Sequence, residues 1–409
     1  MEDARKTLIL NIKKGFSVGL KKPYFYISPD KVHYHQWFWD SSFHIIVSSI
    51  LNPEWAKLEL KTLLSVQEEN GFIPHVIFWK LRSYDFYHLW WIRETNLFPY
   101  YTAEIQPPVI GISLKRIFDA TQDIDFIKEN ISKVEKFYLF LEKERDPDKD
   151  GLISIITPME SGMDLSPQYD IALGNKKHDP LLTKKKIKNL LKIYRKMNWN
   201  YKKILENNFF DVEDVAFNVI YCLGLEAISE IYKKLGDKNK GNFYEKKAAS
   251  LTEKIISKFW DDKEKIFFSL WRVKNKEKFL KVKTISSLFP IALNIPSKYI
   301  NYLLQHITNR KEFWAFYPLP TVSMDEPSFG PLTDTRYIWR GTTWINTNWF
   351  IATGLKRHKE FKIFKRLKEK TIELIKRAGF CEFYDPFTAE PGKAMKGFGW
   401  STLVVDFLT

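Results

Sequence analysis

Apolar residues recur at helical spacing along most of this chain, and no other pattern constrains its fold as strongly. Residues 211–236 show the pattern best, because their apolar side chains fall on one stripe of a helix. Asp211 is placed to cap the start of this helix, and Gly236 stands where a helix commonly ends. The stripe consists of Val215, Val219, Leu223, Ala227 and Ile231.

Similar periodicity occurs in further segments, and together they predict an all-α fold whose consecutive helices pack antiparallel. The strongest strand pattern, over 265–273, predicts one arm of a hairpin. No glycine-rich loop follows a strand, so a nucleotide-binding fold has no support. Because no linker rich in Pro, Gly or Ser divides the chain, we expect one domain over 1–409. The further helical segments are 4–20, 41–51, 54–69, 103–121, 123–145, 184–206, 239–259, 297–308, 343–356, 358–378 and 394–408.

The chain carries a net charge of +15 and only two cysteines. The densest lysine run, 183–203, has the spacing of an amphipathic helix with a solvated basic face. We therefore interpret the charge as a lysine-rich surface and expect no nucleic-acid partner, since no recognition module is visible. Cys222 and Cys381 are too few for a disulfide framework and argue against a thiolate metal site. Without a signal-peptide pattern or 18 consecutive apolar residues, the sequence predicts a cytoplasmic protein with no membrane span.

Long segments between the predicted helices hold most of the Trp, Pro, Asp and His residues. Long ordered loops in a compact domain commonly carry function. Aromatic residues make up 16% of the chain, which suits either core packing or flat platforms for sugar rings and bases. The long segments are 21–44, 71–108, 146–170 and 310–345, with a shorter one around Glu382.

The segment HYHQWFWDSSFH, residues 33–44, places Trp39 beside Asp40. An aromatic face next to a carboxylate matches a sugar ring, whose CH groups stack while its hydroxyls donate to the acid. The alternative is a pair of core tryptophans with Asp40 capping the following helix. In QEENGFIPHVIFW, residues 67–79, a turn precedes His75, and a helix cap followed by a packed loop explains that stretch on its own.

Two acidic stretches lie in the third long segment. The first, DPDKDG, begins like a calcium loop, but Thr157 occupies the position where such a loop needs a bidentate Glu. We therefore predict a turn there and no metal site. The second, TPMESGMDLSPQYD, places Glu160 and Asp164 beside Ser, Gly and Pro. Surface loops carry carboxylates for solubility and catalytic loops carry them as proton donors, and this stretch alone fits both.

Two later segments combine aromatic and polar residues. YIWRGTTWINTNWF, residues 337–350, joins Trp and Asn residues to Arg340, which suits a cavity that is partly apolar and partly hydrogen-bonding. GFCEFYDPFTAEPG, residues 379–392, surrounds Glu382 with aromatic side chains. A carboxyl group in such surroundings tends to have a raised proton affinity.

Taken in order, these segments resemble glycoside hydrolase family 63. The resemblance covers about residues 30 to 405 and is nearest to short bacterial and archaeal members, which include mannosylglycerate hydrolases and α-glucosidases. It implies an (α/α)6 barrel with the site at one mouth. It also implies inverting hydrolysis of a small α-linked carbohydrate such as mannosylglycerate or glucosylglycerate, without a cofactor. The motifs are HQWFWDSSFH, NGFIPHVIF, QPP at 106–108, ESGMDLSP, WRGTTWINTNW and EFYDPFTAEPG followed by GFGWST.

By the same resemblance, Asp164 corresponds to the general acid and Glu382 to the general base. An inverting enzyme keeps roughly 6.5–9.5 Å between two such carboxyl groups, because a water molecule lies between them. For the two histidines among the other expected contacts, a structural role is the alternative. The residues expected to contact or support the substrate are His35, Gln36, Trp39, Asp40, His75, Gln106, Glu160, Arg340, Gly341, Trp344, Asn346, Tyr384 and Trp400.

Three positions depart from the pattern of close relatives. Met159 stands where Trp is common, Leu165 where Asn is common, and His33-Tyr34 where Tyr-Pro often precedes HQW. The acid and the base are kept, but the choice among glycerate, a second sugar and another aglycone stays open. An oligosaccharide α-glucosidase or a trehalase-like enzyme is the alternative within the same chemistry. A non-catalytic sugar-binding protein and a basic nucleic-acid-binding protein are the rivals from other classes, and the sequence leaves a homo-oligomer open.

Overall fold

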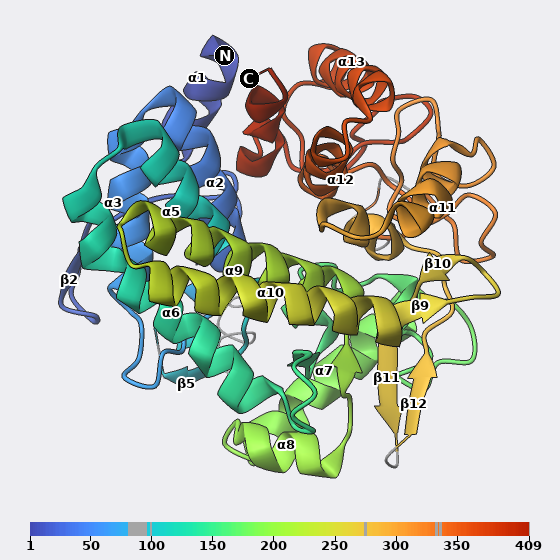
Figure 1. The fold of residues 1–409 in the computed structure, drawn as a ribbon, viewed down its shortest axis with the longest axis horizontal. Coiled ribbons are helices and arrows are strands. Elements are labelled where there is room, and N and C mark those ends of the chain that lie inside the picture. Colours follow the sequence, from blue (N-terminus) through green and yellow to red (C-terminus); the bar gives the residue numbers. More distant parts are fainter. Residues whose placement is uncertain (81–95, 99, 274–275, 332–333, 335–337, 409) are drawn as a thin grey trace.

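The computed structural model describes residues 1–80, 96–98, 100–273, 276–331, 334 and 338–408. Helices dominate this part of the chain, as the apolar periodicity predicts (Figure 1). The α-helices are α1 (Glu2–Asn11), α2 (Phe38–Leu51), α3 (Pro53–Leu64), α5 (Ile110–Thr121), α6 (Ile124–Arg145), α7 (Pro180–Lys196), α8 (Tyr201–Asn207), α9 (Val215–Lys234), α10 (Lys238–Phe259), α11 (Ser297–Thr308), α12 (Ile345–Arg357) and α13 (Phe361–Ala378). The 3-10 helices are η1 (Pro158–Ser161), η2 (Pro167–Tyr169), η3 (Ile285–Ala292) and η4 (Gly399–Phe407).

Six of these elements contact one another in a closed cycle, which we call the contact ring. Its order is α2, α5, α9, η3, α12 and η4, and η4 packs back against α2. Five ring elements also contact the helix that follows them in sequence: α3 on α2, α6 on α5, α10 on α9, α11 on η3 and α13 on α12. The sixth, η4, contacts α1 from the opposite end of the chain. Figure 1 shows the pair α9 and α10 running side by side, and the two chain ends close together. The chain therefore closes on itself, with α1 packed against its last element.

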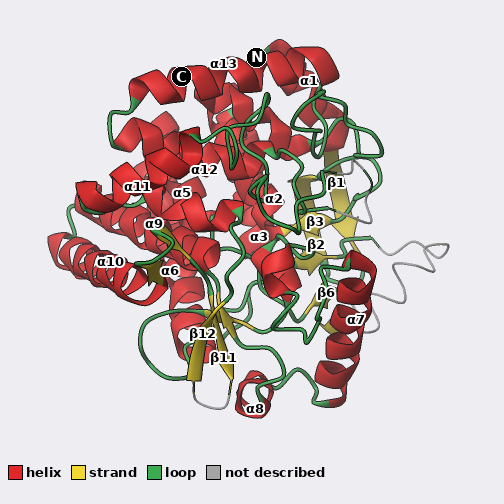
Figure 2. Cartoon of the chain, turned by 90° about the vertical axis from the view of Figure 1, so that its right-hand side faces the viewer, coloured by secondary structure: helices red, strands yellow, loops and turns green. Residues whose placement is uncertain are grey.

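Within the described ranges, short strands form four small antiparallel sheets. Figure 2 shows strands lying among the loops. The strand orders of the sheets are β1-β2, β10-β9, β12-β11-β8-β7 and β3-β4-β6-β5. The pairing of β11 with β12 confirms the hairpin predicted from 265–273. The strands are β1 (Ile12–Ser17), β2 (Lys22–Ile27), β3 (Gln36–Trp37), β4 (Val76–Ile77), β5 (Asn96–Phe98), β6 (Tyr101–Thr102), β7 (Ser154–Ile155), β8 (Val212–Glu213), β9 (Trp260–Asp261), β10 (Ile266–Phe267), β11 (Leu270–Val273) and β12 (Lys276–Phe279).

Buried apolar side chains from the contact ring and its neighbours form one large cluster, and only Val76 and Phe78 make a small separate one among the described residues. Helix α9 belongs to this core, because almost every residue of its first four turns is buried. Among the described helices, α9 alone has the length and apolar composition of a membrane span. Of its most apolar stretch, 89% is buried inside the protein, as in the core helix of a globular fold.

The predicted helix over 4–20 is wrong beyond Asn11. There the chain turns into the hairpin of β1 and β2, whose register pairs Ile12 with Ile27. The buried Asn11 amide donates to the carbonyls of Pro29 and Gly397, so tertiary contacts end the helix. The sequence from 12 to 17 has too few apolar residues on one helical face to compete with them.

Further helix predictions need correction, among them 103–121, whose helix begins only at Ile110. The segment 184–206 contains two helices, because Asn198 and Trp199 take left-handed backbone angles and Asn200 then caps α8. Helix α9 is capped by Asp214, whose carboxylate accepts the N–H of Phe217 at 2.8 Å, and not by Asp211. Parts of the long segments 71–108 and 310–345 lie outside the described residues.

Candidate active site

Residues from distant parts of the sequence line one cavity of about 500 Å³. Many of them lie at the N-terminal ends of contact-ring elements, so the ring brings the predicted loops to one place. A second cavity, of about 330 Å³ beside Lys22 and Glu68, shares no lining residue with it. The lining residues at those ends are Trp37, Trp39 and Asp40 at α2, Gln106 before α5, Trp344 before α12, and Phe398 and Trp400 at η4.

Asp164 reaches this cavity from a tight turn after η1. Gly162 takes a left-handed φ of 73° there, and a Cβ at this position would meet the Trp39 indole at 2.5 Å. The Ser161 hydroxyl donates to the carbonyl of Pro158 and accepts the N–H of Met163, which holds the turn. Glycine is therefore needed both for the backbone angle and for the close approach of Trp39.

Burial raises the pKa of the Asp164 carboxyl. A backbone hydrogen bond, the charges of Lys184 and His75, and a hydrogen bond from the Trp339 side chain oppose that effect without cancelling it. The side chain keeps part of its surface open to the cavity. A carboxyl group in this state holds its proton at a pH where an ordinary aspartate has lost it.

Glu382 approaches the same cavity from the segment after α13. Its backbone N–H donates to the carbonyl of Met395 at 2.8 Å, and its own carbonyl accepts the indole N–H of Trp400 at 3.1 Å. Burial raises the pKa of Glu382 to about 7. His33 lowers the pKa, whereas Asp30 and other nearby carboxylates raise it. Glu382 therefore exchanges its proton near neutral pH.

Trp39 and Asp40 occupy the first turn of α2. The helix begins at Phe38 and has no side-chain cap, so the alternative of Asp40 as its cap is wrong. The Trp39 N–H donates to Oε1 of Gln106 at 3.0 Å, which ties α2 to the predicted QPP motif. Burial raises the pKa of Asp40 to about 7, and its Oδ1 has no hydrogen-bond partner among the described residues. Asp40 thus has an acceptor atom left for a ligand in the cavity.

Tryptophans form one wall of the cavity. The rings of Trp339 and Trp344 stack with centroids 3.5 Å apart and planes 14° from parallel. Trp400 meets Trp344 at 5.5 Å and the edge of Trp39 at 5.8 Å. Flat apolar faces beside ionisable groups suit the CH faces and hydroxyls of a sugar ring.

Two charged residues expected at the substrate lie elsewhere. Glu160 forms a buried ion pair with Arg145 at 2.6 Å and accepts the backbone N–H groups of Ile105 and Ile156. Arg340 gives two hydrogen bonds, of 2.8 and 3.0 Å, to the buried carboxylate of Asp170. Neither residue lines the cavity. Their charges instead anchor the loops that carry Asp164 and the stacked tryptophans.

Five other predicted residues also lie outside the cavity lining. Gln36 accepts the indole N–H of Trp79 at 2.6 Å, and His35 packs its ring edge against Phe78. The Tyr384 hydroxyl accepts the N–H of Cys381 and donates to the carbonyl of Gly379, which braces the Glu382 segment. The other two are Gly341, whose N–H donates to the Thr321 hydroxyl, and Asn346, whose side-chain oxygen accepts the N–H of Thr347.

Three cationic residues line the cavity although the sequence did not single them out as site residues. His33 lines the cavity and belongs to the first aromatic motif, of which only later residues were predicted to contact the substrate. Lys184 and Lys188 lie on α7, which was interpreted as a solvated basic face. The helical spacing could have indicated these two lysines, because they are four residues apart and share a face with Ile187 and Leu191. Both apolar residues also line the cavity.

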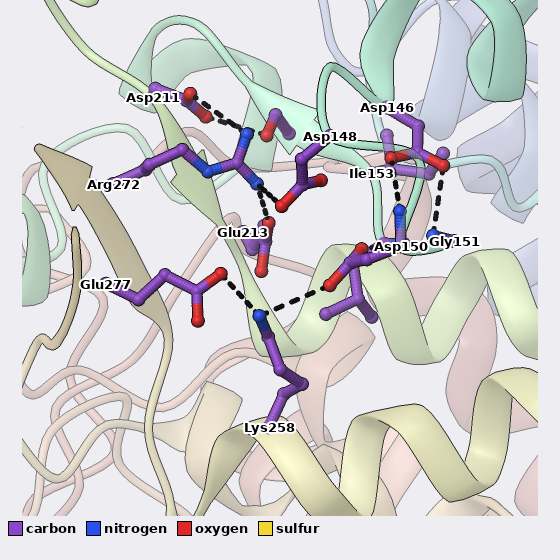
Figure 3. Close-up of polar contacts among 12 residues, drawn as sticks. Asp146, Asp148, Asp150, Gly151, Ile153, Asp211, Glu213, Lys258, Arg272 and Glu277 are labelled. Carbon is purple, nitrogen blue, oxygen red and sulfur yellow. Dashed lines mark hydrogen bonds and ion pairs between the residues drawn. The ribbon is translucent and has the colours of Figure 1, made fainter. Parts of the chain in front are cut away.

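The acidic stretch 146–151 forms a turn, as predicted (Figure 3). The Asp146 carboxylate accepts the N–H groups of Asp150 and Gly151. Four carboxylate oxygens nearby lie within 4.8 Å of one another and could hold a metal ion. Figure 3 shows that Arg272 and Lys258 already bridge them, so two side-chain cations supply countercharge. The four residues are Asp148, Asp150, Glu213 and Glu277.

Two carboxyl groups that face one aromatic cavity are the arrangement that glycoside hydrolysis requires, and the relatives of this chain are glycosidases. The chain belongs to the family described as the mannosylglycerate hydrolase MGH1-like glycoside hydrolase domain, whose model matches residues 33–401.

Individual relatives agree with this membership. The chain is 29% identical to a mannosylglycerate hydrolase of Thermus thermophilus over 402 residues, which covers 92% of this chain and 94% of that protein. It is 25% identical to a glucosylglycerate hydrolase of Mycolicibacterium hassiacum, covering 91% and 92%. The crystal structure of a family 63 mannosylglycerate hydrolase from Thermus thermophilus with Tris and D-glycerate matches all of this chain and 99% of that one, with a TM-score of 0.85 and 26% identity.

Proposed function

We propose that this protein is an inverting α-glycoside hydrolase of small substrates with an acidic aglycone, such as mannosylglycerate or glucosylglycerate. The observation that carries the proposal is that Asp164 and Glu382, far apart in sequence, line the same cavity. The named relatives hydrolyse such glycosides, and they cover almost the whole chain.

In the proposed mechanism, Asp164 gives its proton to the glycosidic oxygen as the bond to the anomeric carbon breaks. Glu382 takes a proton from a water molecule as that water attacks the anomeric carbon from the opposite face. The raised pKa of Asp164 favours the protonated acid. Glu382, with a pKa of about 7, loses its proton near neutral pH and can then act as the base.

Cationic side chains on α7 support an acidic leaving group. Lys184 and Lys188 line the cavity, and the charge of Lys184 acts on the Asp164 carboxyl. The group that accepts the proton of Asp164 must lie next to this acid, and therefore on the same side as the lysines. A carboxylate such as that of glycerate would be stabilised there, whereas a neutral second sugar would gain less.

We also propose that the fold is an (α/α)6 barrel forming a single catalytic domain over 1–409. The contact ring would supply the six inner elements and α1, α3, α6, α10, α11 and α13 the outer ones. The cavity at the N-terminal ends of ring elements would then be the mouth of the barrel. A cytoplasmic location stays a prediction from the sequence.

The decisive experiment is hydrolysis of a panel of mannosylglycerate, glucosylglycerate, trehalose and α-linked glucobioses, with NMR detecting the first anomer released. We expect a glycerate substrate to be preferred and the β-anomer to appear first. Asp164→Asn and Glu382→Gln should each lower kcat by roughly 10²–10⁴-fold. Asp237→Asn, which alters only the cap of α10, is the control. Release of the α-anomer, or wild-type activity in Asp164→Asn, would refute the mechanism.

A separate experiment tests whether the enzyme prefers a substrate with an acidic aglycone. Lys184→Met should raise KM for mannosylglycerate about tenfold and leave KM for a neutral α-glucoside unchanged, because only the anionic substrate loses a charge partner. Lys185→Met on the same helix is the control, since Lys185 is exposed and does not line the cavity. Equal KM increases for both substrates would refute the assignment and favour an α-glucosidase of oligosaccharides.

A further inference from the structure

His33 lies in the active-site cavity and is not used by the mechanism above. It follows β2 in the loop that leads to β3. Its ring meets the edges of the Trp37 and Phe398 rings, with centroids 6.1 Å away in each case. About one third of the side chain remains exposed. The aromatic neighbours therefore hold the ring in one orientation while leaving part of it open to the cavity.

Asp30 fixes His33 from behind. Its carboxylate is buried, and Oδ2 lies 2.8 Å from Nδ1 of His33. The other oxygen, Oδ1, accepts the backbone N–H of His33 at 2.7 Å, and the Ser28 hydroxyl donates to the Asp30 carbonyl. Since Nδ1 carries the proton given to Asp30, the remaining ring nitrogen, Nε2, is the one available to the cavity.

The imidazole is surrounded by negative charge. Burial alone would lower the pKa of His33, but the hydrogen bond and charge of Asp30, together with the charges of Glu382 and Asp40, raise it to about 9. In the opposite direction, His33 lowers the pKa of Glu382. The pKa of Asp40 is lowered first by His44 and then by His33. The four groups form one electrostatic unit, with three carboxyl groups around a single imidazolium.

We propose that His33 is a positioning residue for hydrolysis, which Asp30 holds as a cation beside Glu382 so that Glu382 loses its proton more readily. This inference rests on the proposed role of Glu382 as the general base. Without the cation, Glu382 would face Asp30 and Asp40, whose negative charges favour its protonated form. A protonated Glu382 cannot take a proton from water, so the loss of His33 would be felt as a loss of base at neutral pH.

The loss of His33 should shift the pH profile in one definite direction. Loss of the imidazolium raises the pKa of Glu382, so the acidic limb of the kcat/KM profile moves to higher pH. A nearby opposite charge typically shifts the pKa of a carboxyl group by about 1–3 units, and the partial exposure of His33 favours the lower half of that range. Activity below the limb should therefore fall roughly ten- to hundredfold, while activity above it recovers. The main charges acting on Asp164 are Lys184 and His75, so the alkaline limb should stay in place.

The test is the pH profile of kcat/KM from pH 5 to 9 for wild type, His33→Gln and His33→Lys. We expect the acidic limb to move up in His33→Gln and to stay near its wild-type position in His33→Lys, which keeps the charge. His306→Gln is the matched control, because His306 also pairs with a carboxylate, Glu312, but does not line the cavity. A decrease of the same factor at every pH, or a KM change alone, would overturn the inference.

A second measurement separates this inference from the proposed function. NMR of protein labelled with ¹³C-histidine, with the His33 signal assigned by its absence in His33→Gln, follows the imidazole without substrate. We expect this signal to titrate near pH 9. If the His33 signal titrates near pH 9 in a protein that hydrolyses no substrate of the panel, the proposed function is refuted. The positive charge of His33 at neutral pH is then still confirmed. If the signal titrates near pH 6.5 in an active enzyme, the inference fails and the proposed function stands.

Discussion

The buried ion pair between Arg145 and Glu160 allows a quantitative test of how the acid loop is held. Arg145 ends α6 and Glu160 lies in η1, four residues before Asp164. Both side chains are fully buried, and the guanidinium gives two hydrogen bonds, of 2.6 and 3.1 Å, to the carboxylate. The perturbation is Arg145→Met, which keeps apolar volume but leaves Glu160 without its cation.

The expected cost follows from the burial of the pair. Removing one partner of a buried ion pair typically destabilises a protein by about 3–5 kcal/mol, because the other charge stays desolvated. Two backbone N–H groups still bind Glu160, which favours the lower half of that range. At an unfolding entropy of about 2.1 cal/mol/K per residue, a chain of this length should lose about 3.5–4.7 °C in Tm. The whole folding free energy is only about 5–15 kcal/mol.

The assay is urea unfolding at pH 7, followed by circular dichroism, with Arg357→Met as the matched control. Arg357 binds Glu226 with the same two distances, 2.6 and 3.1 Å, but both side chains are partly exposed. Surface pairs contribute about 0–1 kcal/mol, so the control should lose much less. Adding Glu160→Gln to Arg145→Met should recover part of the loss. Equal losses in Arg145→Met and Arg357→Met would refute the reasoning from burial.

Further predictions concern the two proposed catalytic segments. Because burial raises the pKa of Glu382 to about 7, the unfolded chain releases this proton at lower pH and stability falls as pH rises from about 4 to 7. Glu382→Gln should therefore raise the free energy of unfolding at pH 8, by at most about 3 kcal/mol, and have little effect at pH 4 in urea titrations. Gly162→Ala should lower both stability and kcat/KM, since its methyl group would meet Trp39 at 2.5 Å. Gly174→Ala, with a similar φ and no atom within 4 Å of the new Cβ, should cost about 1 kcal/mol and leave kcat/KM unchanged.

Several residues of the candidate site could be predicted from the sequence. Trp39 and Asp40 were singled out from a short motif and Gln106 by the family resemblance, and all three line the cavity together with Asp164 and Glu382. Such motifs contain local information, because a turn with a required glycine or an aromatic residue beside a carboxylate is specified within a few positions. The roles of the acid and the base stay predictions until the variants are measured.

The sequence predicted the positions of charged residues less well than those of aromatic ones. Glu160 and Arg340 were expected at the substrate, yet each is paired with a buried opposite charge, Arg145 or Asp170. His33 was passed over, although its cavity position and its bond to Asp30 make it part of the site. The sequence does not show whether a charged residue will pair with a ligand or with another side chain.

By itself, the sequence determined the helical architecture, the lysine-rich surface and the segments that carry the chemistry, because periodicity and turn residues act over a few positions. Only the tertiary structure decided which charges face the cavity and which are used to hold loops, and where α1 ends. Several of those outcomes depend on contacts between residues 170 or more positions apart, such as Asn11 with Gly397 and Asp170 with Arg340. The free energy of a buried charge is set by such neighbours and not by its place in the chain.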